Sequence, residues 1–197
     1  MNQKLDEHFQ RLIQKIQEPD FQKNKGLSNE VGYYIFTYDV KDTLTIRNKL
    51  DDLMYSRLAR KIHLKVFDLY DIMLDSIKRL KDIADDDPFE MIKQMEHQGG
   101  IAKVIQQINN LMQMDENEND IVKYIQKRMD DQRAVIFITG VGKVYPLIRA
   151  HKVLNTMHQV LDQNPVVMFY PGDYDELNLQ IFGETNDQNY YRAFPIK

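Results

Sequence analysis

The apolar positions at the start of the chain follow a helical period. Large apolar residues recur every three or four positions over 3–17, which predicts an amphipathic helix. We expect this helix to stop at Glu18, because the residue before a proline is disfavoured in helical conformation.

From residue 33 the pattern alternates between strand and helix. Runs of β-branched and aromatic residues predict strands at 33–40 and 63–69. Helical spacing follows each strand, over 44–60 and 70–83. This order predicts a parallel sheet covered by helices, in which the crossover connections are right-handed.

Residues 84–131 contain helical patterns and no strand pattern. We interpret them as a helical insertion between the second and third strands. Their Met and Gln content suits an adaptable surface, while apolar stripes of this kind more commonly belong to a core. Breaks at Asp85–Pro88, Gly99–Gly100 and the acidic run 115–120 separate helices that begin at Pro88, Ile101 and Ile121.

The last third returns to strand patterns. Nearly continuous apolar runs predict buried strands at 134–139 and 165–170, joined by a helix over 145–161. Pro171–Gly172 is expected to turn the chain. Alternation over 177–182 predicts an edge strand, and 190–196 could add a last short one.

Together these elements predict a single α/β domain over 1–197. It would have three layers and a mostly parallel sheet of about five strands. The layout is like that of P-loop NTPases but without their Walker motifs, and the helical insertion at 84–131 lies between the second and third strands.

Charge singles out one stretch of this domain. Residues 132–161 contain no Asp or Glu and four Lys or Arg, in a chain of net charge -4. The acidic balance argues against a dedicated non-specific DNA-binding protein. Absence of cysteine excludes disulfides and thiolate chemistry, and no apolar run approaches the ~20 residues of a membrane span. We therefore expect a cytoplasmic protein.

Within this stretch, residues 140–143 read Gly-Val-Gly-Lys after a strand pattern. A Walker loop needs a glycine at 137 and Ser or Thr at 144, where this chain has Phe137 and Val144. These departures argue against ATP hydrolysis. Two interpretations stay open: phosphate binding by backbone N–H groups and Lys143, or a strand-to-helix turn whose glycines permit positive φ.

The helix expected after this turn carries the remaining basic residues. Arg149, His151 and Lys152 would form a solvated face, or alternatively contact nucleic acid or a protein partner. His151 and His158 are seven residues apart with no carboxylate nearby, so we expect no metal there. Its buried stripe would contain Leu147, Ala150, Leu154, Met157 and Leu161.

Asp39 and Asp68 each follow a predicted parallel strand. Ligands of open α/β sheets bind outside these strand ends, so the two acids could serve a hydrolase or nuclease. Asp is also a common N-cap of a following helix, which is the favoured interpretation. Near the C-terminus, Tyr170, Tyr174, Tyr190, Tyr191 and Arg192 could stack on bases or simply pack.

Four sequence blocks of the C-terminal part resemble the BrxB family of BREX (bacteriophage exclusion) systems. The blocks, within about 139–194, read TGVGKVYPLIRAHKVLN, PVVMFYPGDYD, LQIFG and NYYRAF. The resemblance implies a small accessory protein of a system that also contains a DNA methyltransferase, a PglZ-like protein and a large ATPase. The candidate binding residues are Gly140, Gly142, Lys143, Arg149, His151, Lys152, Tyr174, Tyr190, Tyr191 and Arg192.

The resemblance therefore predicts a non-catalytic adaptor subunit that binds the methyltransferase, PglZ-like protein or ATPase. The alternative is a module that binds DNA or nucleotide phosphates through the basic strand–turn–helix at 139–152. We expect no cofactor, metal or membrane association, and homo-oligomerisation is left open.

Overall fold

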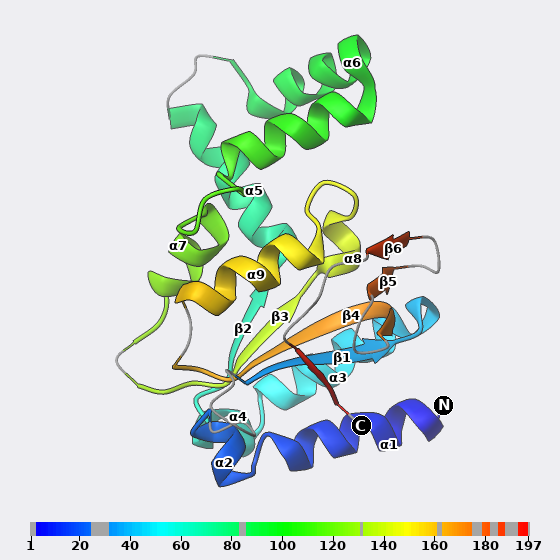
Figure 1. Cartoon of the computed structure of the whole chain (residues 1–197), viewed down its shortest axis with the longest axis vertical. Helices are drawn as coiled ribbons and strands as arrows, with labels where there is room; N and C mark the ends of the chain where they lie inside the picture. Colours follow the sequence, from blue (N-terminus) through cyan, green and yellow to red (C-terminus); the bar gives the residue numbers. More distant parts are fainter. Residues whose placement is uncertain are drawn as a thin grey trace.

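A sheet with helices on both faces forms the centre of the computed structural model (Figure 1). The structure describes residues 3–24, 32–82, 86–130, 132–160, 163–174, 179–181, 185–187 and 193–196. The strands are β1 (Tyr33–Tyr38), β2 (Lys65–Asp68), β3 (Ile136–Thr139), β4 (Val166–Tyr174), β5 (Leu179–Ile181), β6 (Thr185–Asp187) and β7 (Phe194–Pro195). The helices are α1 (Gln3–Lys15), α2 (Pro19–Gln22), α3 (Thr43–Met54), α4 (Arg57–Lys61), α5 (Leu69–Arg79), α6 (Pro88–Leu111), α7 (Asp120–Gln126), α8 (Val141–Val144) and α9 (Ala150–Val160), with 3-10 turns η2 (Val40–Asp42) and η3 (Leu80–Asp82).

Five strands form a parallel sheet in the order β2-β3-β4-β1-β7. The chain passes from β1 to the far edge at β2 and then returns through β3 to β4, beside β1. The outward connection runs through α3 and α4 on one face, and the return runs through α5 to α9 on the other. The return connections run in the opposite direction along the sheet and over the opposite face. Both sets of crossovers therefore have the same hand, as parallel connections require.

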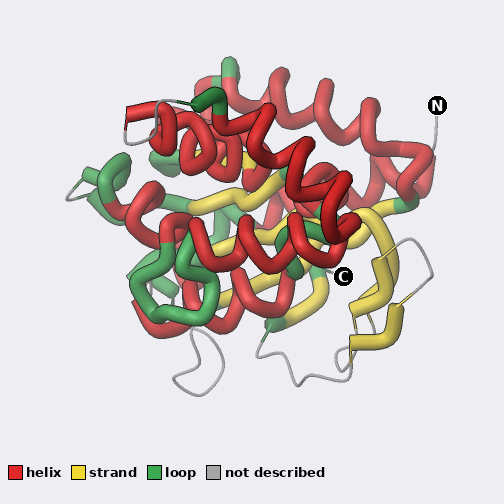
Figure 2. The backbone as a smooth tube through the Cα atoms, turned by 90° about the horizontal axis from the view of Figure 1, so that it is seen from above, coloured by secondary structure: helices red, strands yellow, loops and turns green. Residues whose placement is uncertain are grey.

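Each face of the sheet has its own apolar core, because successive strand side chains point to opposite faces. On the β4 strand, Val166 and Met168 pack with α5, α7 and α9, whereas Val167 and Phe169 pack with α1, α3 and α4. The predicted three-layer α/β architecture and mostly parallel sheet are confirmed. Figure 2 shows the two added antiparallel strands, β5 and β6, at one side of the molecule beyond the end of β4.

Two predicted helices differ from the structure. The helix expected over 44–60 is broken, because the Ser56 hydroxyl accepts a 3.2 Å hydrogen bond from the Ala59 N–H and starts α4 anew. The helix expected from 145 begins at Ala150, since Tyr145 precedes a proline and has extended backbone with ψ 136. Of the expected buried stripe, Leu154 and Met157 are buried, Leu147 and Ala150 are half-buried, and Leu161 lies outside the described residues. Ile148, Val153 and Thr156 are buried as well.

The expected turn at Pro171–Gly172 is also wrong, because β4 continues to Tyr174. Past Met168 the strand loses β3 as a partner, and from Gly172 its edge pairs with β5 instead. A Cβ on Gly172 would lie 2.1 Å from the Gln180 carbonyl oxygen, so the glycine permits this close pairing. A strand is confirmed at 179–181, within the expected 177–182, but β5 pairs with β4 on one side and with β6 on the other, so it is not an edge strand. β7 lies within the last expected strand, whose Tyr190, Tyr191 and Arg192 lie outside the described residues.

The helices between β2 and β3 divide into a core part and a projecting part. In α7, Ile121 and Ile125 are fully buried against α5 and α9, as ordinary core residues. The long α6 extends away from the sheet and folds back as an arm, whose returning segment packs Val104 and Ile108 into the core (Figure 1). Its direction changes at Gly100, where φ is 66 and ψ is -172.

Replacing Gly100 by alanine is expected to lower the stability of this arm by about 1–3 kcal/mol, because that backbone region is essentially restricted to glycine. A Cβ would meet no atom within 4 Å, so the cost arises from the backbone alone. Amide hydrogen exchange across α6 measures the effect. Gln94→Ala, at an exposed helical position of the same arm, is the control and should change protection little. Equal protection in both variants would contradict the prediction.

Candidate functional site

The basic turn singled out by sequence is built around the Asp68 carboxylate. Asp68 ends β2 and caps α5, because its Oδ1 accepts a 3.0 Å hydrogen bond from the Tyr70 N–H. Its Oδ2 accepts hydrogen bonds from the Thr139 hydroxyl at 3.1 Å and from Lys143 Nζ at 2.7 Å. The end of β2 is thereby joined to the end of β3 and to α8.

Gly140 makes this arrangement possible. Its φ of 78 lies in the left-handed region, and a Cβ there would lie 2.3 Å from Asp68 Oδ1. The glycine therefore serves both the turn and the close approach of a carboxylate. Gly142 lies inside α8, which has only four residues. Lys143 forms an ion pair with Asp68, so its positive charge is neutralised within the turn. A phosphate site would instead need that charge to be available to the ligand.

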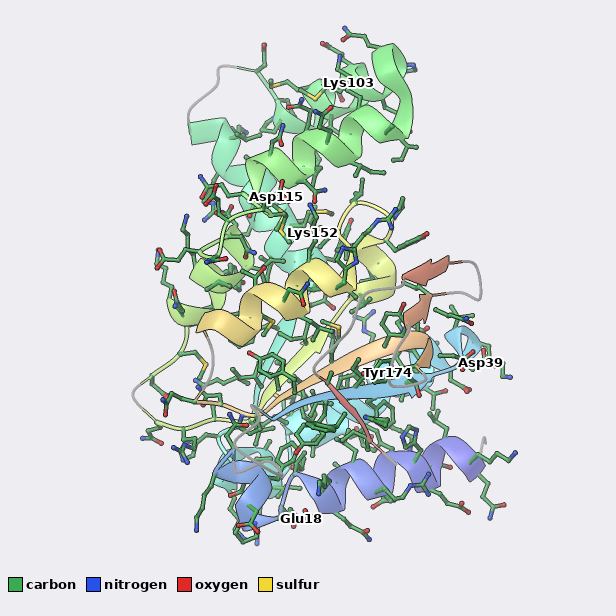
Figure 3. The ribbon with its side chains drawn as sticks, viewed as in Figure 1. Glu18, Asp39, Lys103, Asp115, Lys152 and Tyr174 are labelled. Carbon is green, nitrogen blue, oxygen red and sulfur yellow. The ribbon has the colours of Figure 1, made fainter. Side chains whose placement is uncertain are left out.

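The basic side of α9 faces the helical insertion. Lys152 Nζ lies 2.6 Å from Asp115 Oδ1, in the turn after α6, and Figure 3 shows these two side chains meeting. The neighbouring Asn109 reinforces the contact, because its Nδ2 donates to the Leu147 carbonyl oxygen at 2.7 Å. Arg149 is exposed and His151 half-buried, and neither is without an interaction partner. This side of α9 therefore holds the insertion against the sheet.

The remaining candidates do not join this cluster. The Tyr174 hydroxyl, at the end of β4, donates a 2.7 Å hydrogen bond to the Ala193 carbonyl oxygen and fixes the chain just before β7. In Figure 3, Tyr174 lies beside strands β4 and β1, whereas Lys152 lies on the far side of α9. Tyr190, Tyr191 and Arg192 lie outside the described residues, so their proposed contacts stay predictions.

Asp39 and Asp68 are not brought together. Their strands β1 and β2 are separated by β3 and β4, which places the strand ends about 14 Å apart at ordinary strand spacing. Asp39 accepts a 3.0 Å hydrogen bond from the Lys41 N–H as the N-cap of η2. Hydrogen bonds from the Lys41 side chain and backbone lower the Asp39 pKa and leave the carboxylate ionised. Each acid serves as a cap of its own helix, as the favoured interpretation predicted.

Asp39 also lines a pocket at the carboxyl ends of β1 and β4. The pocket has a volume of about 410 Å³ and includes Tyr38, whose burial raises its pKa, and Asp173. The connections leave β1 and β3 toward opposite faces of the sheet here, which is where open α/β sheets commonly bind ligands. Within the described ranges, however, no three His, Asp or Glu side chains gather closely enough to hold a metal ion.

A second acid-free stretch is denser in basic residues than 132–161. Residues 53–67 contain four Lys or Arg in half the length, namely Arg57, Arg60, Lys61 and Lys65. In the structure they lie on α4 and β2, and Lys61 lines a pocket beside the amino ends of the strands. Counting Lys and Arg per residue in each acid-free stretch identifies this region from the sequence alone.

Three comparisons bear on the identity of the chain. The family model described as "BREX protein BrxB" matches residues 65–196. A BrxB protein of Bacillus cereus (strain H3081.97) is 37% identical over 198 residues, which cover 100% of this chain and 97% of that protein. A BrxB protein of Escherichia coli O9:H4 (strain HS) is 29% identical over 193 residues, covering 98% and 91%.

No solved structure matches the chain. None of the described helices has both the length and the apolar character of a membrane span. The two relatives extend the similarity from the C-terminal blocks to the N-terminal helix and first strand, since they align with nearly the whole chain. The chain therefore belongs to the BrxB family of BREX proteins.

Proposed function

We propose that this chain is a non-catalytic adaptor of a cytoplasmic BREX-type phage-defence complex. In this role it binds the methyltransferase, the PglZ-like protein or the large ATPase. The observation that carries the proposal is the α6 arm, which projects from the body of the molecule (Figure 1). Val104 and Ile108 of this arm pack into the core, and its exposed side chains extend the surface available to a partner.

The arm presents apolar side chains to solvent. Phe89 is 40% exposed and Ile101 is 50% exposed, and they begin the two helical segments on either side of Gly100. Met91 and Met95 add flexible, half-buried side chains to the first segment. Aromatic residues and Met are enriched in protein interfaces, and a polarizable thioether adapts to a partner surface.

The alternative, phosphate binding at 139–152, lacks such support. Lys143 forms an ion pair with Asp68, and Lys152 forms one with Asp115. A phosphate would have to displace these carboxylates before it could use either lysine. The contacts at this turn therefore favour a structural role for the basic residues.

Co-purification tests the adaptor role. A tagged chain is expressed with the methyltransferase, the PglZ-like protein and the ATPase, and we expect at least one of them to co-elute on size exclusion. Phe89→Asp with Ile101→Asp should weaken that complex at least tenfold, equivalent to about 1.4 kcal/mol or more. Leu44→Asp is the control: this side chain is 67% exposed on α3, so its loss should leave the complex intact.

Two results would contradict the proposal. A chain that elutes alone in the presence of all three proteins would exclude the adaptor role. A complex equally stable in the arm variant and in Leu44→Asp would show that the arm is not the contact surface.

A further inference from the structure

Two depressions lie among α1, α2, α3 and α4. Figure 1 shows these helices on the side of the sheet away from the α6 arm. The first, of about 350 Å³, has an apolar floor that includes Phe9, Ile13 and Leu53. The second, of about 420 Å³, lies beside the amino ends of the strands. Leu58 of α4 lines both, so the two depressions adjoin at this side chain, and we refer to them together as the groove.

The second depression is basic. Lys23, Lys61, His63 and Arg133 line it, and none of the described residues that line it is Asp or Glu. In the part of the chain that the structure describes, Lys23 and Lys61 are exposed and no ion pair engages either ammonium group. Arg133 Nη1 donates a 3.1 Å hydrogen bond to the Lys23 carbonyl oxygen, which fixes the guanidinium at the pocket wall.

These cations differ from the basic residues of 139–152. There, carboxylates of the same chain neutralise the lysines, whereas among the described residues no carboxylate forms an ion pair with Lys23 or Lys61, which lie beside an apolar surface. Lys65 lies nearby but is engaged by Asp130 at 3.4 Å. The groove thus combines a half with an apolar floor, whose lining also includes Lys49 and Asp52, with a cationic half, as expected of a surface that binds a ligand with both kinds of group.

We infer that this groove docks an acidic amphipathic helix or extended segment of a partner protein. Apolar side chains of the segment would occupy the floor at Phe9, Leu53 and Leu58, and its carboxylates would pair with Lys61 and Arg133. The inference rests on the proposed adaptor function and assigns a second contact surface to it.

Two other occupants fit less well. A DNA backbone offers phosphates but no apolar groups for the floor of the first depression. A second copy of this chain offers one exposed apolar side chain among acids, Phe89 beside Asp86, Asp87 and Glu90, for a floor that has room for several apolar groups. A partner segment with apolar anchors and flanking carboxylates matches both halves of the groove.

Reconstitution with the full-length methyltransferase, PglZ-like protein and ATPase tests the inference. Zero-length crosslinking with a carbodiimide joins lysine amines to carboxylates, and the products are mapped by mass spectrometry. We expect Lys23 or Lys61 to crosslink with Asp or Glu residues of one amphipathic segment in one partner. Lys61→Glu with Arg133→Glu should weaken that partner's binding at least tenfold.

The control reverses two charges outside the groove. Lys4→Glu with Arg47→Glu changes net charge by the same amount, on exposed positions of α1 and α3. We expect it to bind the partner as the unmodified chain does. Circular dichroism of both double variants establishes that each is folded.

The outcomes separate the groove from the adaptor role. A partner complex that forms equally well with both double variants overturns the groove and leaves the adaptor role standing. Absence of any complex overturns both. Binding of a fluorescein-labelled 20-base-pair DNA duplex that is lost only in Lys61→Glu with Arg133→Glu overturns the peptide ligand in favour of nucleic acid. Self-association that is lost in Lys61→Glu with Arg133→Glu would overturn the partner ligand.

Discussion

Replacing Phe169 by alanine is expected to lower the free energy of unfolding by about 3–5 kcal/mol, the range for a large aromatic side chain removed from a core. Phe169 lies on the central strand β4 and is 1% exposed. Its ring centroid is 5.1 Å from that of Phe36 and 5.0 Å from that of Phe137. Truncation would leave a cavity between three parallel strands and the helices α1 and α3, where neighbours cannot easily collapse.

Urea denaturation followed by circular dichroism measures this loss. Phe169→Leu retains most of the volume and should cost clearly less than the alanine variant. Phe89→Ala is the surface control, because that ring is 40% exposed on the α6 arm, and its change should stay within about 0.5 kcal/mol. A Phe169→Ala loss no larger than that of Phe89→Ala would contradict the assigned core.

The sequence predicted the elements of this core better than their arrangement. Strand patterns around Tyr33 and Val166 are local, because side chains alternate between two buried faces over a few residues. The pairing of these two strands is not local: β1 lies beside β4, more than 130 residues later in the chain. No periodicity within one segment specifies which other segment will lie next to it, so the order β2-β3-β4-β1-β7 needed the structure.

The same limit explains the basic turn. Sequence showed that 132–161 lacks acids, and from that lack a free cationic surface was one interpretation. The acids that neutralise it come from elsewhere: Asp68 pairs with Lys143 across 75 residues, and Asp115 pairs with Lys152 across 37. A segment rich in basic residues forms a basic surface only where the fold places no acidic side chain next to it.

Two predicted helix boundaries are wrong for a different reason. Helical periodicity continues through Ser56 and through Tyr145, so apolar spacing alone gave one helix in each region. Capping by the Ser56 hydroxyl and the steric effect of Pro146 on Tyr145 override that spacing. Both are visible in the sequence as residue types, but their effect competes with packing, which only the folded chain decides.

Replacing Gly140 by alanine is the next largest expected effect. The left-handed backbone costs a residue with a Cβ about 1–3 kcal/mol. The new Cβ would also lie 2.3 Å from Asp68 Oδ1 and displace a carboxylate that accepts three hydrogen bonds, which adds about 1–3 kcal/mol. We therefore expect a loss in unfolding free energy clearly larger than that of Gly100→Ala, whose Cβ meets no neighbour.

A double-mutant cycle with Asp68→Ala separates the two contributions. In the Asp68→Ala background the carboxylate is already absent, so Gly140→Ala should retain only its backbone cost. The expected coupling is about 1 kcal/mol or more between residues that touch. An equal cost of Gly140→Ala in both backgrounds would show that the glycine serves the turn alone. A coupled cost would instead establish that Gly140 also makes room for the Asp68 carboxylate, which Thr139 and Lys143 of the same turn bind.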